Sequence, residues 1–133
     1  MMDYDPIERD VLDLGKSIAR ALKDIGASIY PLVPDVNAGF PLITYQRTDL
    51  TELSSEDNYC HEATATYDIV IAARDYEESV QLARSVRAAM RSLNTNDITM
   101  NVHPVLISGS EGAERDGSAY VYLQFLTYKI TIE

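Results

Sequence analysis

The sequence predicts an α+β fold: a mostly antiparallel sheet of about four to five strands with two α-helices packed on one face. Two segments combine helix-capping signals with apolar residues at helical spacing, and five others have an extended pattern. These elements follow one another in the order α-β-β-β-α-β-β, which favours helices segregated to one side of a sheet. Residues 1–133 are expected to form one domain, long enough to bury roughly two-thirds of its unfolded surface.

The first helix is predicted to begin at its cap, Asp5, and to end at Gly26, a left-handed stop. Pro6 suits the first helical position, and Glu8 stands three residues after the cap, as in a capping box. Apolar residues then recur at steps of three and four, which places them on one stripe of the helix: Ile7, Val11, Leu14, Ile18, Leu22 and Ile25.

Three extended segments follow this helix. Ser28–Val33 is short, and Phe40–Thr48 alternates in polarity after Pro41, which is typical of an edge or of the start of a strand. Tyr59–Ala73 also alternates, with two sets of side chains expected on opposite faces. The polar, acidic stretch Asp49–Asn58 predicts a loop between these two longer strands.

The second helix is predicted to begin after Asp75, with Glu78 completing a second capping box. Its expected buried side consists of Val80, Ala83, Val86, Ala89, Met90 and Leu93, and the polar stretch Asn94–Asp97 ends it.

The C-terminal third predicts two more strands. Ile98–Ser108 is extended, with Pro104 indicating a bulge or an edge, and Ala119–Ile132 is the longest strand. Between them, Gly109–Gly117 is rich in glycine and charge and predicts a flexible loop, whose deletion should leave the fold intact.

The composition excludes several classes of protein. Acids outnumber bases 21 to 11, and the resulting charge of −10 disfavours nucleic-acid binding as a primary role. The lone Cys60 excludes an internal disulfide and a zinc site built on cysteine pairs. The N-terminus lacks the bases and apolar run of a secretory signal, and no stretch approaches 18 uninterrupted apolar residues, so neither export nor a membrane span is expected.

No catalytic constellation stands out. Cys60 and His61 are adjacent on a predicted strand, so their side chains point to opposite faces, and His103 is distant in sequence. Paired acids such as Glu77 and Glu78 are better explained as first-turn residues favoured by the helix dipole. We therefore expect no enzyme activity, no cofactor and no metal.

The candidate functional residues are instead those of subunit and partner contacts. Three arginines, Arg84, Arg87 and Arg91, are expected on one face of the second helix. We hypothesise that this basic face contacts an acidic segment of a neighbouring subunit. The segment contains no lysine or arginine, and its acids are Asp49, Glu52, Glu56, Asp57 and Glu62. Complementary patches at two separate sites give a contact that closes into a ring. Further candidates are Glu111, Glu114 and Arg115 in the predicted loop, and Tyr120 and Tyr122 in a segment that is apolar on both faces. The alternative interpretation is that these are solvated charges and ordinary sheet residues.

The order and spacing of these segments resemble the phage tail-terminator or tail-completion family, also described as minor tail or head–tail joining proteins. The likeness covers nearly the whole chain. It is carried by the aromatic-Pro strand entry Phe40–Gln46, the strand Ala63–Ala73, the helix Asp75–Met90 and the closing strand Phe125–Ile132, with the first helix and Ile29–Pro31 in matching places.

The resemblance implies a structural role without catalytic residues. Such proteins form a homo-oligomeric ring, often a hexamer, at the head-proximal end of the tail tube. The ring stops tube polymerisation, offers a surface to the head connector, and lets DNA pass without specific binding. The implied location is the virion, and the host cytoplasm during assembly. Alternative functions are another head–tail connector or stopper protein, a small non-catalytic α+β binding module, and a small hydrolase using scattered carboxylates.

Overall fold

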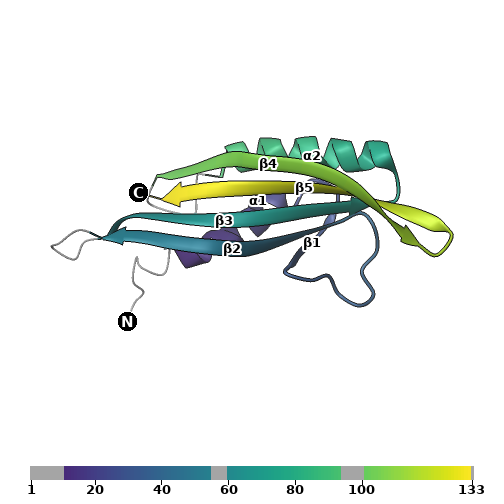
Figure 1. The fold of residues 1–133 in the computed structure, drawn as a ribbon, viewed down its shortest axis with the longest axis horizontal. Helices are drawn as coiled ribbons and strands as arrows, with labels where there is room; N and C mark the ends of the chain where they lie inside the picture. Colours follow the sequence, from purple (N-terminus) through teal and green to yellow (C-terminus); the bar gives the residue numbers. More distant parts are fainter. Residues whose placement is uncertain (1–10, 55–59, 94–100, 133) are drawn as a thin grey trace.

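The structure is a computed structural model that describes residues 11–54, 60–93 and 101–132. After a 3-10 turn at Val11–Asp13, its elements are α1 (Leu14–Leu22), β1 (Ser28–Pro31), β2 (Leu42–Ser54), β3 (Cys60–Ala73), α2 (Tyr76–Arg91), β4 (Val102–Asp116) and β5 (Ala119–Ile132). The predicted α+β fold and the predicted order of elements are confirmed (Figure 1).

The five strands form one sheet in the order β1-β2-β3-β5-β4. Only β1 and β2 run parallel, and the other neighbours are antiparallel. The four long strands have 13 to 15 residues, or roughly 45 Å at about 3.3 Å per residue. Since β1 pairs only with Leu42–Tyr45, the rest of β2 forms one outer edge of the sheet, and β4 forms the other.

Both helices pack on one face of this sheet. Alternate residues of β3, including Tyr67, Ile69 and Ile71, point toward them and are buried, which confirms the predicted alternation of this strand. They meet side chains of α1, α2 and β5 in one core, whose largest fully buried members include Leu14, Ile18, Leu22, Ile43, Ile69, Ile71, Val86, Met90, Ile130 and Ile132. We call this side of the sheet the helix face.

No helix of the described residues lies on the opposite side of the sheet, which we call the open face. Its central rows are polar and are joined across strands: Thr127 donates a 2.9 Å hydrogen bond to Asp68, and the hydroxyls of Thr64 and Thr131 lie 3.3 Å apart. A small apolar cluster of Leu42, Ala72 and Val121 lies on this face at one end, packed against Tyr30, Ala38 and Leu123.

The cap of α2 is confirmed, because the backbone N–H of Glu78 donates a 3.0 Å hydrogen bond to Asp75 Oδ2. Its buried side differs in part from the prediction. Val86, Met90 and the following Leu93 are buried, and so are Ser79 and Leu82, whereas Val80, Ala83 and Ala89 are only half-buried. The predicted end of the helix at Asn94–Asp97 lies outside the described residues, and α2 itself ends at Arg91.

The first helix is shorter than predicted within the described residues. Its predicted start at Asp5–Glu8 lies outside them, and α1 ends at Leu22 instead of at Gly26. Gly26 has a positive φ of 97°, so it does adopt the left-handed conformation, but in the turn that follows the helix. Ile25, in the same turn, still packs against the core.

Both predicted loops were wrong over most of their described length. β2 continues to Ser54, so that only 55–58 of the predicted loop lies outside the described residues, and β4 continues to Asp116. Cross-strand pairing with β3 and β5 supplies the backbone hydrogen bonds that polar composition alone does not predict. The chain turns only at Gly117 and Ser118, where Gly117 has a φ of 68°. The predicted edge position of Pro104 is confirmed, and a bulge follows between Leu106 and Ser108.

Candidate assembly surface

The predicted acidic segment divides between the two faces of the sheet. Asp49 opposes Thr66 and Glu62 opposes Leu53, which places both acids on the open face, whereas Glu52 opposes the buried Ala63 on the helix face. Asp49 and Glu52 are exposed on β2, and Glu62 is half-buried on β3. Glu56 and Asp57 lie outside the described residues. The three described acids therefore border an edge of the sheet and do not lie in a loop.

The three predicted arginines are exposed on α2. Arg87 and Arg91 line a cavity of about 160 Å³, together with Met90, Pro104, Leu106 and Tyr128. Burial raises the pKa of the Tyr128 phenol above its ordinary value of 10.0, and the positive charges of Arg87 and Arg91 partly oppose that rise. The arginine side of α2 is thus turned toward β4, the outer strand of the sheet.

The predicted contact residues of the β4–β5 hairpin interact with one another and with α2. Arg115 donates a 3.0 Å hydrogen bond to the Tyr120 hydroxyl, and its guanidinium lies 5.3 Å from the centre of the same ring. Glu111 accepts hydrogen bonds from Tyr76 and Gln124 at 3.0 and 3.1 Å. A further residue, Tyr122, meets the Tyr76 ring edge-on at 6.0 Å between centroids, while Glu114 is exposed on the open face. Glu111, Arg115, Tyr120 and Tyr122 therefore all have contacts within the chain.

Arg74 connects this hairpin to the loop that precedes β2. Its guanidinium forms a 2.8 Å ion pair with Asp116 at the end of β4, and it lies 4.6 Å from the centre of the Phe40 ring. Phe40 is the second-last residue of the connection between β1 and β2, so the loop and the hairpin are joined at the same end of the sheet.

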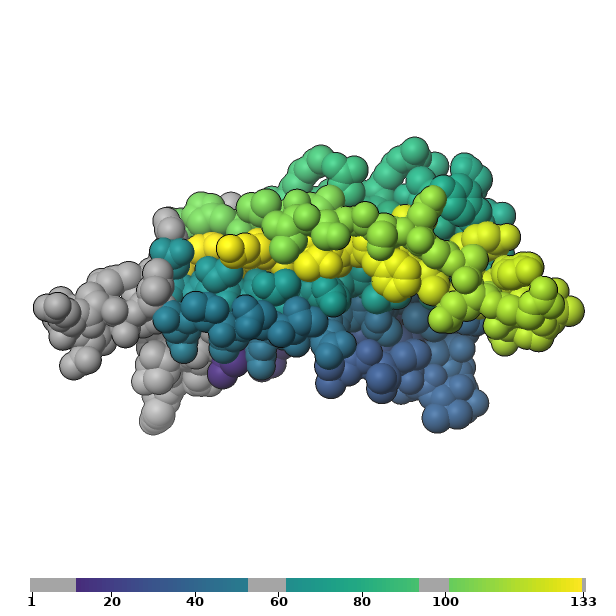
Figure 2. All heavy atoms as spheres, viewed as in Figure 1, coloured from purple at the N-terminus to yellow at the C-terminus, as the bar shows by residue number. Residues whose placement is uncertain are grey.

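That loop carries exposed apolar side chains that the sequence analysis did not single out. Leu32 is 61% exposed, Val33 73% and Val36 100%. Leu32 has a φ of 66°, a left-handed conformation that is strained for this residue type, and Val33 N–H closes a tight turn onto Pro31 O at 2.7 Å. Figure 2 shows the loop protruding at the lower right of the molecule. The available signal was an apolar pair, Leu32-Val33, placed between two prolines.

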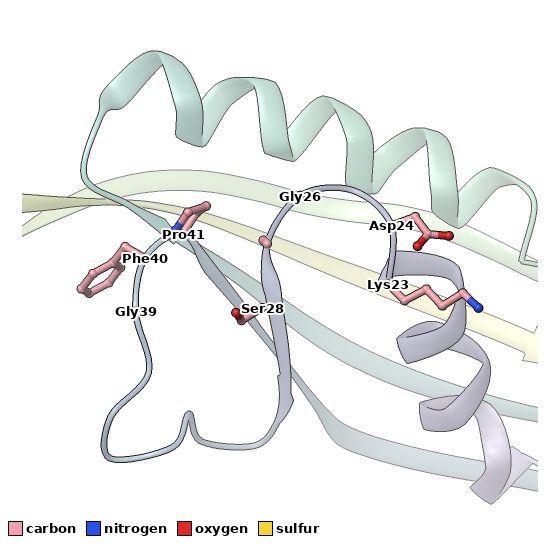
Figure 3. Close-up of a pocket in the computed structure, with 8 residues that line it drawn as sticks. Lys23, Asp24, Gly26, Ser28, Gly39, Phe40 and Pro41 are labelled. Carbon is pink, nitrogen blue, oxygen red and sulfur yellow. The ribbon is translucent and has the colours of Figure 1, made fainter.

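A depression of about 530 Å³ lies beside the base of this loop, lined by Lys23, Asp24, Gly26, Ala27, Ser28, Gly39, Phe40 and Pro41. Its only charged residues, Lys23 and Asp24, point away from Phe40 (Figure 3). Side chains that could act together as acid and base do not converge there.

The described residues contain neither a metal-binding cluster nor a membrane-spanning helix. Within residues 11–54, 60–93 and 101–132, no group of three or more His, Cys, Asp or Glu side chains could hold a metal ion. His103 is exposed on β4, and the side chains of Cys60 and His61 lie outside the description. Over the same part of the chain, no helix has both the length and the apolar character needed to cross a membrane.

Comparisons with known proteins place the fold. No protein-family model matches the chain, and no curated protein matches its sequence significantly. Among solved structures, the chain is similar to a chain from the virion of a native gene transfer agent particle: the TM-score is 0.54 at 12% identity, over 96% of this chain and 89% of that chain. The type 4 fimbrial biogenesis protein PilO from Pseudomonas aeruginosa also matches, with a TM-score of 0.40 at 11% identity, over 97% of this chain and 73% of that one. The first likeness shows a shared fold, and the second is too distant to carry an argument.

Proposed function

We propose that this chain is a structural protein of a phage-like virion, which forms a ring at the head-proximal end of the tail tube, ends tube polymerisation and presents a surface to the head. The observation that carries the proposal is the likeness of fold to a gene transfer agent virion chain, which extends over nearly the whole of both chains. A match of that extent leaves little of the chain for an added catalytic module.

The shape of the subunit supports a role between neighbours. The sheet is long, its outer edges on β2 and β4 lie on opposite sides, and one end carries the protruding apolar loop. The β2 and β4 edges are placed for contacts with neighbouring copies in the same ring. The exposed apolar loop at one end of the sheet is placed for contacts with a ring above or below. The net charge of −10 fits a ring through which DNA passes without being held.

The second candidate is a different connector or stopper protein of the same junction, which would use the same surfaces for other neighbours. A small-molecule binding module is less well supported. The depression of about 530 Å³ is lined mainly by loop residues, and its two charged side chains point away from Phe40 (Figure 3).

Deletion of the gene from the genome that encodes the chain separates the two virion roles. Loss of a terminator should give overlong tail tubes without heads, because nothing stops tube growth. Loss of a connector or stopper should give tubes of normal length that fail to join heads. Electron microscopy of lysates, with the gene restored in trans as the control, distinguishes these outcomes, and particles of normal form would contradict both roles.

A further inference from the structure

We propose that copies of this chain associate side by side, with the β2 edge of one copy against the β4 edge and the arginine side of α2 of the next. The inference deepens the proposed ring and rests on it, because it names the two surfaces that would close the ring. Its starting point is a separation of charge between the two edges of the sheet.

One half of the β4 side lacks acids, whereas Glu111, Glu114 and Asp116 lie in the other half of β4. Residues 79–96 contain three arginines and no acid, and residues 101–110 also contain none, in a chain that has 21 acids. The β2 side has the opposite character: Asp49 and Glu52 lie on β2 and Glu62 on β3, and the sequence contains neither lysine nor arginine from 48 to 62. Among the described residues, Asp49 and Glu52 present this charge on the exposed part of β2. At the end of the sheet where Asp49 and Glu52 lie level with Val105 and Val102, the two edges are therefore electrostatically complementary.

The strand register places the opposite charges at matching heights on the open face. Asp49 pairs with Thr66, Thr66 with Lys129, and Lys129 with Val105, so one row runs from the acidic β2 edge through Lys129 to the β4 edge. A copy related by rotation about an axis parallel to the strands keeps this height. Asp49 of one copy then faces Val105 on β4 of the next copy. Lys129 of that next copy lies beside Val105 on the adjacent strand, β5.

The helix face has a corresponding row. Glu52 pairs with Ala63, Ala63 with Ile132, and Ile132 with Val102, at the end of the sheet where α2 finishes with Arg91. Arg91 and Arg87 line the cavity over Pro104 and Leu106, and so reach the β4 edge on this face. The two acids of β2 thus meet positive charge on both faces of the next copy.

The cation nearest the acidic edge does not oppose the contact. Arg47 pairs with Tyr67 on the helix face of β2, the face opposite to Asp49, and lies several residues from Glu52 along the strand. On the receiving edge, Val105 and Ile107 are 56% and 53% exposed and supply apolar surface between the charges. Pro104 lacks an N–H donor and a bulge follows it, so the contact consists of side chains and is not a continuous hydrogen-bonded ladder.

A disulfide-trapping experiment tests the contact. Thr51 on β2 and His103 on β4 are both exposed and lie at opposite ends of one row of the open face. The row runs from Thr51 to Thr64, then to Thr131 and His103, by cross-strand pairing. In a Cys60→Ser background, the variant carrying both Thr51→Cys and His103→Cys should form, on mild oxidation, a ladder of covalent oligomers that ends at the ring size. Thr51→Cys mixed with His103→Cys should give dimers only, and neither single variant alone should give any. The control variant carries Thr51→Cys together with Glu114→Cys. Glu114 is also exposed on β4, but at the opposite end of the strand from His103, so this variant should give no ladder.

The outcomes separate this contact from the ring itself. A closed oligomer in native mass spectrometry without a ladder would overturn the contact and leave the ring intact. Disulfide dimers of a single variant would indicate a two-fold contact and overturn it too. A monomer that forms no ladder at millimolar concentration or on tail tubes would contradict both proposals. As a second measurement, Glu52→Arg or Arg91→Glu should weaken association by about tenfold or more, and the two together should restore it, because like charges repel across an interface.

Discussion

The phenol of Tyr76, in the first turn of α2, donates a 3.0 Å hydrogen bond to Glu111 on the edge strand β4, 35 residues away. The same carboxylate oxygen accepts a 3.1 Å bond from Gln124, which also donates to Ser79 inside the helix at 3.3 Å. This network connects α2 to β4 and β5 at the stretch whose composition predicts a loop. It is one physical reason why that stretch stays in the sheet.

Tyr76→Phe should loosen β4 locally, because the substitution removes the donor and keeps the ring packed on Tyr122. The expected result is faster amide hydrogen exchange at residues 109–113, with little change in the urea midpoint of global unfolding. Glu111→Gln, which retains an acceptor for the phenol, serves as the matched control. Unchanged exchange in Tyr76→Phe would show that pairing with β5 alone holds this part of β4.

Two buried tyrosines should make the fold sensitive to alkaline pH. Burial is the main cause that raises the pKa of Tyr67 and of Tyr128 above 10.0. The folded state then keeps these protons longer than the unfolded state, so their contribution to stability is complete below pH 10 and is lost as pH rises through the raised pKa values. Urea midpoints measured from pH 8 to about pH 11.5 should fall at the upper end, since unfolded tyrosines ionise near pH 10. Tyr128→Phe should show a smaller fall, and an equal fall would assign the effect to other groups.

The elements that the sequence predicts well are those fixed by local patterns. The alternation around Tyr67 and Ile69 and the cap at Asp75 depend on neighbours in sequence, and both appear in the structure. The extent of β2 and β4 depends on partners far along the chain. Gly109 and Gly112 favour a loop by composition, yet both are paired in β4, opposite Leu126 and Leu123.

The candidate surface was predictable only in part. The exposure of Arg84, Arg87 and Arg91 follows from helical spacing, and the odd spacing of Asp49 and Glu52 puts them on opposite faces of a strand. Which of the two acids lies on the helix face depends on the bulge between Arg47 and Asp49. The exposed apolar loop was not predicted, because the pair Leu32-Val33 between two prolines is equally typical of the buried end of a strand. Its exposure depends on the short parallel pairing of β1 with β2, which no local pattern indicates.

Asp75→Ala should destabilise the protein by about 1 kcal/mol, as loss of a helix N-cap does in general. The reason is the 3.0 Å bond that Asp75 accepts from the Glu78 backbone, which alanine cannot replace. Asp75→Asn keeps an acceptor and is expected to remain close to the parent. Urea unfolding of the three proteins provides the comparison, and equal losses for alanine and asparagine would point to lost charge instead of a lost cap.

Deleting residues 109–117 should now destabilise the fold, in contrast to the expectation for a loop, because it removes the partners of Ala119–Leu126 in β5. A milder change replaces Arg115–Tyr120 by Asn-Gly, a pair suited to a two-residue hairpin turn, and removes only the two outermost pairs. This shortened hairpin should remain folded, as judged by circular dichroism and cooperative urea unfolding. A folded, cooperative product of the full deletion would show that β4 is dispensable beyond Ser108.

Replacing Val33 and Val36 by serine should leave stability unchanged and impair assembly onto a neighbouring ring. Val36 is fully exposed and Val33 is 73% exposed, so neither contributes much buried surface within the chain, and the unfolding free energy should change by less than about 0.5 kcal/mol. Under the proposed function, these side chains bury apolar surface against a partner, and their loss should reduce co-sedimentation with tail tubes. Gln81→Ala, an exposed change on α2, is the control for surface substitution in general. Full co-sedimentation of the double serine variant would exclude the loop from the axial contact, whereas a loss of stability would show that the strained turn at Leu32 depends on these residues.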